Sequence, residues 1–353
     1  MQKKGREKLK EHVYKTALIG TGRIGFTLGI DKKREQPASH TMALKKNKHF
    51  LIEAGCDSDN KRLANWKQFT SAKKVYANAD ALFEDFSPEV VVIAVNENAH
   101  LDTALKAIAA KPRLILLEKP VALHLDDAFK IQTASTEYGV PILINHERRF
   151  SEDYRIAKKY IAKIGKILTI NARLDSGLYV YNPAAEHSGE YSLLHDGTHL
   201  VDTVLYLLET TCGEENILKN CTISSISCDD KNNKIIRSVS AHFETDICAD
   251  VNLFFSGQSR FFGFEIDIIG SEGRIKVGNG IFELYKREES KLYTGFYSLE
   301  KDKSIRRPKK TRYFSNMIKN AADFLNGSSP LLSNLQTGIN AMKVLEKIKE
   351  SFL

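Results

Sequence analysis

Five short apolar segments in the first 150 residues constrain the fold more than any other feature of this sequence. Segments with apolar residues at helical spacing, such as 99–110 and 125–138, separate them. Strands that are apolar along their whole length and joined by helices predict a parallel sheet covered on both faces. The apolar segments are VYKTALIG (13–20), FLIEAGCD (50–57), VVVIAV (90–95), RLILLEK (113–119) and PILINH (141–146).

The pattern changes near residue 150. Beyond Cys221, several stretches alternate apolar and polar residues, which is typical of an antiparallel sheet with one solvated face. The elements expected in this half are helices at 153–164, 195–208, 316–325 and 338–352, a strand at 167–175, a loop at 176–192, strands at 221–227, 237–244, 247–256, 261–271, 273–277 and 281–287, and a solvated basic loop at 301–312.

The size of the chain fits two domains. It has 353 residues, of which 42% are hydrophobic and 27% charged, which is ordinary globular composition at about 150 residues per domain. We predict an α/β fold in which a doubly wound parallel sheet is followed by an α+β domain with a large open, mostly antiparallel sheet. The predicted parts are a basic tail at 1–12, a dinucleotide-type domain at 13–150, a substrate and oligomerisation domain at 151–330 and a C-terminal helix at 331–353 that packs back on the body.

Several classes of protein are excluded by composition. The apolar runs are far shorter than the ~20 residues of a membrane-spanning helix, and the basic start of the chain is not followed by the apolar core of a secretory signal. Five cysteines without a CxxC pair indicate neither a disulfide framework nor a zinc knuckle. We expect a cytoplasmic protein without a membrane partner.

The net charge of +8 raises the question of nucleic acid. The basic residues are spread over the N-terminal tail and several short clusters, of which 306–312 (RRPKKTR) is the densest. No predicted helix carries a continuous basic stripe. We interpret the charge as a source of solubility and of attraction for anionic small molecules, and expect no nucleic-acid partner.

A glycine-rich turn, Gly20-Thr-Gly22-Arg23-Ile24-Gly25, follows the first apolar segment. This is the G-x-G-x-x-G pattern between a strand and a helix that dinucleotide binding requires. The first glycine permits a tight turn, the second lets the backbone approach a pyrophosphate, and the third lets helix and strand pack closely. Free N–H groups at the helix start then face the phosphates. We therefore predict a Rossmann domain whose turn binds NAD.

An acidic residue, Asp57, ends the second apolar segment. A carboxylate at this place binds the ribose 2′-hydroxyl of NAD and would repel the 2′-phosphate of NADP. We expect a preference for NAD, which the neighbouring Lys61 and Arg62 moderate, so that NADP stays possible. The alternative is that Asp57 caps the following helix.

The spacing within this domain is unusual. Asp57 lies 32 residues after Gly25 (57 − 25), against about 20 in the usual pattern. The excess falls near 31–40, DKKREQPASH. We favour a tolerated surface insertion; the alternative is a loop over cofactor or substrate, with Arg34 or His40 as an anion contact.

Five motifs in a fixed order extend the pattern. Their order resembles that of the glucose–fructose oxidoreductase / inositol dehydrogenase (Gfo/Idh/MocA) family, from about residue 14 to the C-terminus. The resemblance implies an NAD(P)-dependent oxidoreductase that acts on sugars, polyols or nucleotide sugars. The motifs are VVIAVNENAH (91–100), LLEKPVAL (116–123), NHERRF (145–150), HDGTHLVDTVLYL (195–207) and IIGSEGRIKVGNG (268–280).

The resemblance also implies which residues are functional. The family's Lys in Glu-Lys-Pro falls on Lys119, and its catalytic His falls on His199. The Asp that the family carries four residues before that His is replaced by His195, and a carboxylate stands instead at Asp196. We expect all four residues to be catalytic, with Asp196 or His195 in place of the family's Asp.

Further cofactor contacts follow from the same resemblance. The family's Thr-Pro-Asn turn is altered here to Val95-Asn96-Glu97, while His100 fits the end of that motif. We expect Val95, Asn96, His100, Glu118 and Lys119 to contribute to the cofactor site.

The proposed chemistry matches the residue types. A histidine of near-neutral pKa is a suitable base for a sugar hydroxyl, and a lysine stabilises developing negative charge on oxygen. Lys119 leaves the carboxyl end of a parallel strand, where such sheets bind ligands. Since His199 belongs to the second domain, we expect the site in a cleft between the domains.

Each of these residues also has a structural alternative. Lys119 would then end a strand in solvent, His199 would be a hydrogen-bonded helix histidine, and Asp196 would cap a helix. His195 and His199 share a helix face with Asp202, which suggests a metal. Because no complete ligand motif is present, we predict no metal site.

Four residues are candidates for contact with substrate. We expect Arg149, His146, Tyr179 and Asn182 to contact it. In the alternative, Arg149 and His146 pair with acidic residues instead.

Two other functions stay open: an NAD-dependent glycoside hydrolase that uses transient oxidation, and a non-enzymatic dinucleotide-binding regulator. The open sheet predicts a homodimer or homotetramer.

Overall fold

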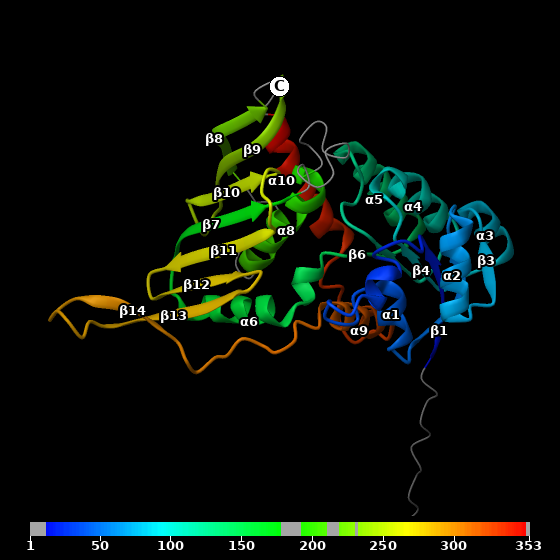
Figure 1. Ribbon diagram of the computed structural model, residues 1–353, viewed down its shortest axis with the longest axis horizontal. Coiled ribbons are helices and arrows are strands. Elements are labelled where there is room, and N and C mark those ends of the chain that lie inside the picture. The colour runs from blue at the N-terminus through cyan, green and yellow to red at the C-terminus, as the bar shows by residue number, and fades with distance from the viewer. Residues whose placement is uncertain (1–11, 178–191, 210–218, 230–231, 351–353) are drawn as a thin grey trace, which may run out of the picture. The chain divides into compact units, whose positions relative to one another are not determined.

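The structure, a computed structural model, describes residues 12–177, 192–209, 219–229 and 232–350 (Figure 1). The chain divides into two compact units, and it enters each of them more than once. The first unit comprises Met1–Leu117, Ala134–Leu143 and Phe314–Leu331, and the second comprises Glu118–Thr133, Ile144–Tyr313 and Leu332–Leu353.

The first unit is built on a six-stranded sheet in the order β3-β2-β1-β4-β5-β6. Strands β1 to β5 pair in parallel, and every residue of β4 and β5 is buried. The strand order reverses between β1 and β4, as in doubly wound folds, so the predicted fold class is confirmed. The strands are β1 (Tyr14–Ile19), β2 (Phe50–Cys56), β3 (Lys74–Tyr76), β4 (Val90–Ile93), β5 (Leu114–Leu117) and β6 (Ile142–Ile144).

Helices alternate with these strands, as the sequence pattern predicts. Strand β3 is not predicted, because its three half-buried residues are too few to show a period. Among the described residues, no helix is both long and apolar enough to cross a membrane. The helices around this sheet are η1 (Thr27–Ile30), α1 (His40–Lys45), α2 (Asn60–Thr70), α3 (Ala79–Asp85), η2 (Glu97–Ala99), α4 (His100–Ala109), α5 (Leu125–Tyr138) and α9 (Tyr313–Leu325).

The inserted segment 31–40 interrupts the helix that the glycine turn would otherwise open. Only the short η1 follows the turn, and α1 begins after the insertion. Thr41 attaches α1 to the glycine turn, because its N–H and its Oγ1–H both donate to the Gly25 carbonyl, at 3.0 and 2.6 Å. Its Oγ1 also accepts the Nε1–H of Trp66 at 2.9 Å. One hydroxyl thus joins the turn, α1 and α2.

The second unit is built on an eight-stranded sheet in the order β14-β13-β12-β11-β7-β10-β9-β8. Among the pairings that the described residues form in this sheet, only β10–β7 is parallel, which confirms the predicted, mostly antiparallel character. The sequence pattern does not predict β14, a short and exposed edge strand. The strands are β7 (Ile167–Asp175), β8 (Lys219–Asp229), β9 (Asn232–Glu244), β10 (Val251–Ser256), β11 (Gly263–Gly270), β12 (Gly273–Gly278), β13 (Ile281–Glu289) and β14 (Tyr297–Lys301).

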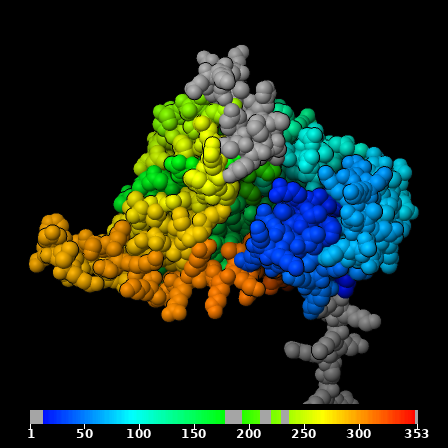
Figure 2. Space-filling view, viewed as in Figure 1, coloured from blue at the N-terminus to red at the C-terminus, as the bar shows by residue number. Residues whose placement is uncertain are grey.

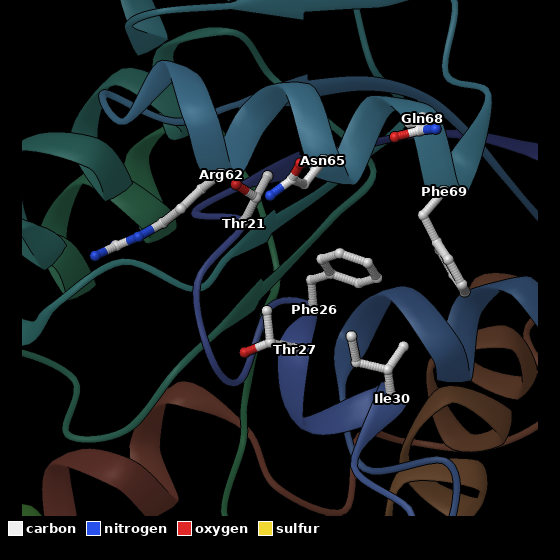
Figure 3. A pocket seen from close by; sticks show the side chains of 8 residues that line it. All are labelled: Thr21, Phe26, Thr27, Ile30, Arg62, Asn65, Gln68 and Phe69. Atoms are coloured by element: carbon white, nitrogen blue, oxygen red, sulfur yellow. The ribbon is translucent and has the colours of Figure 1, made fainter.

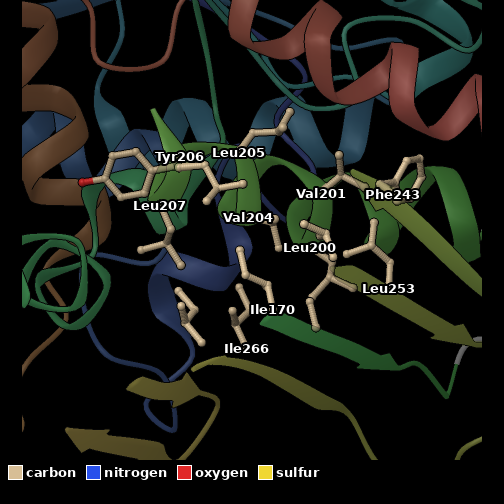
Figure 4. Close-up of a cluster of buried hydrophobic side chains, with 14 of the residues drawn as sticks. Ile170, Leu200, Val201, Val204, Leu205, Tyr206, Leu207, Phe243, Leu253 and Ile266 are labelled. Atoms are coloured by element: carbon tan, nitrogen blue, oxygen red, sulfur yellow. The ribbon is translucent and has the colours of Figure 1, made fainter. Parts of the chain in front are cut away.

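Helices cover one face of this sheet and form its core (Figure 4). Leu200 and Val204 of α8 pack there against Ile170, Leu253 and Ile266 of the strands. Helix α10 adds Leu345 and Ile348 to the same cluster. The helical segments of this unit are η3 (Glu147–Phe150), α6 (Glu152–Tyr160), η4 (Ile161–Lys163), η5 (Ser192–Asp196), α8 (Gly197–Leu208) and α10 (Leu335–Glu350).

The opposite face of the sheet carries cross-strand ion pairs. Residues of β11 alternate between buried and half-buried, and two of the half-buried ones, Glu265 and Asp267, pair with basic residues of β12. Lys276 Nζ lies 2.8 Å from Glu265 Oε1, and Arg274 pairs with Asp267. One face of the sheet is thus buried by the core, and the other carries charged pairs, as the alternation predicts.

The Thr41 hydroxyl provides a test of this packing. We expect Thr41→Val to lower the free energy of unfolding by about 1–3 kcal/mol, because it leaves the buried Trp66 N–H without its acceptor. Thr41→Ser keeps the hydroxyl and should stay close to wild type. Urea unfolding followed by the fluorescence of Trp66, the single tryptophan, measures both. Equal stability of the two variants would contradict this role.

Candidate functional site

The glycine turn excludes side chains at two positions and leaves space at the third. A Cβ on Gly20, whose φ is +96°, would lie 2.4 Å from the Ala94 carbonyl oxygen. A Cβ on Gly25 would lie 2.0 Å from the Gly20 carbonyl oxygen. At Gly22 the nearest atom is Arg62 Nη1, 3.8 Å away. Gly20 and Gly25 are therefore needed for packing, whereas the surroundings of Gly22 are open, as a pyrophosphate requires.

Backbone donors at this turn are also available. In the part of the chain that the structure describes, the N–H groups of Gly22, Arg23 and Ile24 form no hydrogen bond. The turn then closes with Phe26 N–H donating to the Gly22 carbonyl at 2.9 Å. A set of unpaired N–H groups on an open glycine turn fits an anionic phosphate.

Asp57 faces the same turn. Its Oδ2 accepts the N–H of Thr21 at 2.7 Å and the Thr21 hydroxyl at 2.8 Å, and its Oδ1 accepts the N–H of Asp59 at 2.9 Å. The cap of α2 is Asp59, which accepts the N–H groups of Lys61 and Arg62. Asp57 is thus held at the turn and does not cap the helix, which favours the ribose contact over the capping alternative.

A cavity of about 520 Å³ opens beside this turn, between η1 and α2 (Figure 3). Its apolar lining consists of Phe26, Ile30 and Phe69. It begins at Thr21, the residue that holds Asp57. The polar lining consists of Thr21, Thr27, Arg62, Asn65 and Gln68.

The two cationic candidates of the insertion have structural partners instead. His40 is buried and packs edge-on against Phe314, with ring centroids 5.2 Å apart. Arg34 is exposed and lies 3.5 Å from Asp31. Neither arrangement favours the anion-contact alternative over a surface insertion.

The turn after β4 presents its backbone more than its side chains. Asn96 is exposed and Val95 half-buried. His100 is buried, and its Nε2 lies 3.2 Å from the Val95 carbonyl oxygen. His100 thus contacts this turn from within, and the cofactor contacts of Val95, Asn96 and His100 stay predictions.

In the second unit, Lys119 reaches the start of α8. Its Nζ donates to the backbone carbonyl of His195 at 2.9 Å. Glu118 beside it is buried and accepts the Asn145 amide at 2.5 Å. The Glu-Lys-Pro segment is therefore brought to the segment that carries His199, although the two lie far apart in the sequence.

His199 stands in the first turn of α8. Its Nδ1 is buried and has no hydrogen-bond partner among the described residues. Burial lowers the pKa of His199 well below 6.5, and the positive charges of Arg148 and Lys119 and the nearby His146 and His195 lower it further. His199 is therefore neutral at pH 7 and able to accept a proton.

The Asp196 side chain does not cap α8. It occupies the N-cap position of α8, but its side chain makes no capping hydrogen bond. Its Oδ2 instead accepts the hydroxyl of the buried Ser176 at 2.8 Å. His195 contributes its backbone carbonyl to Lys119.

A buried charge cluster lies beneath these residues. Arg149 Nε donates to both oxygens of Asp202, at 2.8 and 2.9 Å, and its Nη1 donates to Glu209 at 2.5 Å. His146 Nδ1 lies 3.1 Å from Asp202, and its Nε2 lies 3.1 Å from Thr198 Oγ1. Arg149, His146 and Asp202 are each 1% exposed. The structure thus favours the pairing alternative for Arg149 and His146 over direct substrate contact.

Thr198 and the role of Asp202 are not evident from the sequence pattern. The available signal is the spacing of Asp202 one turn after His199 on an apolar helix, where a charge needs a partner. Among the described residues, no three His, Cys, Asp or Glu side chains could hold a metal ion. The predicted substrate contacts Tyr179 and Asn182 lie outside the described residues.

Comparisons with known proteins agree with this description. Residues 14–146 match the model of an oxidoreductase family with an NAD-binding Rossmann fold. A 2,7-anhydro-N-acetylneuraminate hydratase of Mediterraneibacter gnavus is 28% identical over 43% of this chain and 37% of its own. A scyllo-inositol 2-dehydrogenase (NAD(+)) of Bacillus subtilis is 25% identical over 76% of this chain and 75% of its own.

The fold has close structural counterparts. An NAD-binding oxidoreductase of Klebsiella pneumoniae superimposes with a TM-score of 0.77 at 19% identity, over 96% of this chain and 97% of that one. At this identity the match concerns the fold. The chain spans about two fifths of the length of the first curated relatives that it matches.

Gly22 allows a test of the nucleotide site that is separate from folding. We expect Gly22→Ala to fold normally, because open space surrounds its Cβ, and to weaken NAD binding by about tenfold or more, or ~1.4 kcal/mol. Gly25→Ala should instead destabilise the fold, because its Cβ meets the Gly20 carbonyl. Thermal unfolding and calorimetric titration of NAD⁺ measure both effects. Unchanged affinity of Gly22→Ala would contradict the predicted contact.

Proposed function

Because this chain belongs to the glucose–fructose oxidoreductase / inositol dehydrogenase (Gfo/Idh/MocA) family, we propose that it is an NAD(P)-dependent oxidoreductase. It transfers a hydride between a nicotinamide cofactor and a CH–OH or C=O carbon of a sugar, polyol or nucleotide sugar. The observation that carries the proposal is the hydrogen bond from Lys119 to the His195 carbonyl, one turn before His199. It joins the two residue types that this chemistry needs.

The residues of the first unit fit a dinucleotide. The open Gly22 and the unpaired N–H groups would hold its pyrophosphate, and Asp57 would accept its ribose hydroxyl. The same carboxylate favours NAD over NADP by charge. When bound, the cofactor supplies the hydride acceptor or donor.

The residues of the second unit handle the proton and the charge. In the oxidation direction, the neutral imidazole of His199 accepts the proton of the substrate hydroxyl. The Lys119 ammonium donates a hydrogen bond to the same oxygen and stabilises its developing negative charge. In reduction, the protonated His199 returns the proton to the carbonyl oxygen.

Relatives in this family also suggest a second reaction. One relative is a hydratase by name, and the open alternative is a hydrolase that oxidises its substrate only transiently. The presence of both Lys119 and His199 favours an enzyme over a regulator, because a regulator needs neither. Product release without net formation of NADH would distinguish transient oxidation from a dehydrogenase.

Loss of either group should abolish turnover. We expect Lys119→Met and His199→Gln to lower kcat by about 10²- to 10⁴-fold, and the NAD affinity of His199→Gln to stay close to wild type. Because the pKa of His199 is lowered, activity should persist below pH 6.5 and fall only as His199 becomes protonated. The measurement is NADH absorbance across a panel of sugars and polyols. Full activity of either variant would refute the assignment.

We also propose a cytoplasmic homo-oligomer. The four described cysteines are free thiols, as in a reducing compartment. The hairpin of β13 and β14 carries exposed apolar side chains at the edge of the sheet, including Leu292 at 82% and Phe296 at 67% exposure (Figure 2, orange). Exposed apolar groups in the connection between β13 and the edge strand β14 favour association with another chain.

Light scattering at micromolar concentration tests this association. We expect a dimer or larger species in the wild type, and a shift toward monomer in Leu292→Ser combined with Phe296→Ser, since both remove apolar contact area. Leu51→Ser, at an exposed position of the first unit, is the matched control. A monomeric wild type would rule out the oligomer.

A further inference from the structure

We propose that His146 is a positioning residue for His199, and that Asp202, acting through His146, supplies the carboxylate that the site lacks at position 195. The proposal rests on the proposed function, because it assigns roles within that proton-handling site. It also assigns a function to Arg149, His146 and Thr198, which are buried and therefore do not contact substrate directly.

Neither nearby candidate contacts His199 in the way the family's Asp would. Position 195 is a histidine whose backbone carbonyl accepts Lys119. The Asp196 carboxylate accepts the Ser176 hydroxyl. Within the described part of the chain, the buried Nδ1 of His199 has no hydrogen-bond partner. The orientation of His199 must therefore come from its helix and from the side chains that pack against it.

His146 is the residue that connects a carboxylate to this helix turn. Its Nδ1 lies 3.1 Å from Asp202 Oδ1, and its Nε2 lies 3.1 Å from the hydroxyl of Thr198. Its ring stands at 73° to the ring of His199, with centroids 6.2 Å apart. Thr198 and His199 are adjacent in the first turn of α8. His146 thus holds the first turn of α8 through Thr198, and its ring lies edge-on to the ring of His199.

The burial of this series assigns it a positioning role. Thr198 is fully buried, and His146 and Asp202 are each 1% exposed. A hydroxyl, an imidazole and a carboxylate in line resemble a nucleophilic triad, but a substrate cannot reach the hydroxyl here. The series therefore acts on the reaction only through His199.

The charge of the cluster keeps Asp202 ionised beside His146. Burial opposes the ionisation of Asp202, but the charge of Arg149 and the neighbouring His146 outweigh it and lower the pKa of Asp202. The ionised Asp202 lies 3.1 Å from Nδ1 of His146, and Nε2 on the other side of that ring lies 3.1 Å from the Thr198 hydroxyl. Arg149 in turn is held by Glu209. Thr198 is thereby connected to Asp202 through the His146 ring.

The groups that face His199 allow a test beyond stability. They are Arg148, Lys119, His146 and His195, and each lowers the pKa of His199. Removal of the His146 ring should therefore raise that pKa, and the acid limb of the activity profile should move to higher pH. A residue with only a structural role would change stability and leave this limb in place.

The experiment compares four full-length variants with NAD present. Thr198→Val removes the hydroxyl, Thr198→Ser restores it, and His146→Gln removes the imidazole. Thr203→Val is the matched control, because this buried hydroxyl of the same helix donates only to the backbone carbonyl of His199 at 2.6 Å. Thermal unfolding and NAD titration confirm that each variant is folded.

We expect Thr198→Val to lower kcat by roughly 10- to 100-fold with little change in KM, Thr198→Ser to recover most of it, and Thr203→Val to resemble wild type. His146→Gln should lower kcat and shift the acid limb upward. Wild-type kcat and pH profile in both Thr198→Val and His146→Gln would overturn the proposal.

A second readout separates this proposal from the proposed function. Histidine titration by NMR measures the pKa of His199 in wild type and in His146→Gln without any substrate. An upward shift in a protein that shows no dehydrogenase activity would support the coupling and reject the proposed function. An unchanged pKa would reject the coupling, whatever the activity.

Discussion

The buried ion pair of Arg149 and Asp202 is the interaction on which the second unit's site depends. It joins the segment after β6 to α8 by two hydrogen bonds of 2.8 and 2.9 Å. Neighbouring residues of the same segment contact Glu118 and Thr198, so the pair also aligns the Glu-Lys-Pro strand end with the first turn of α8. Removal of one partner from such a pair costs about 3–5 kcal/mol, because the other charge stays buried.

A different constraint governs the first unit. There the backbone approaches itself so closely that Gly20 and Gly25 admit no side chain, while Gly22 remains open. Asp57 is attached to this turn by the backbone and hydroxyl of Thr21. The nucleotide site is thus shaped by excluded volume and unpaired backbone donors, whereas the proton-handling site is shaped by buried charge.

The electrostatic surroundings of His199 connect fold to chemistry. Cationic and imidazole groups surround it, and burial removes water that would stabilise its charged form. It is therefore kept neutral over the physiological pH range, which suits a proton acceptor in oxidation. The carboxylates of the second unit near it are occupied: Asp202 by Arg149 and His146, and Asp196 by Ser176.

Local chemistry in the sequence was sufficient for the strand-forming runs, the glycine turn and the Glu-Lys-Pro and helix motifs, because strand burial, positive φ and motif spacing are properties of neighbouring residues. It was insufficient for β3 and β14, which are too short or too exposed to show a period. Only the tertiary structure decided that Asp59 rather than Asp57 caps α2, and that Arg149 and His146 face Asp202. Arg149 and His146 lie more than fifty positions before Asp202 in the sequence. Which charged group a buried side chain contacts depends on how such distant segments pack together.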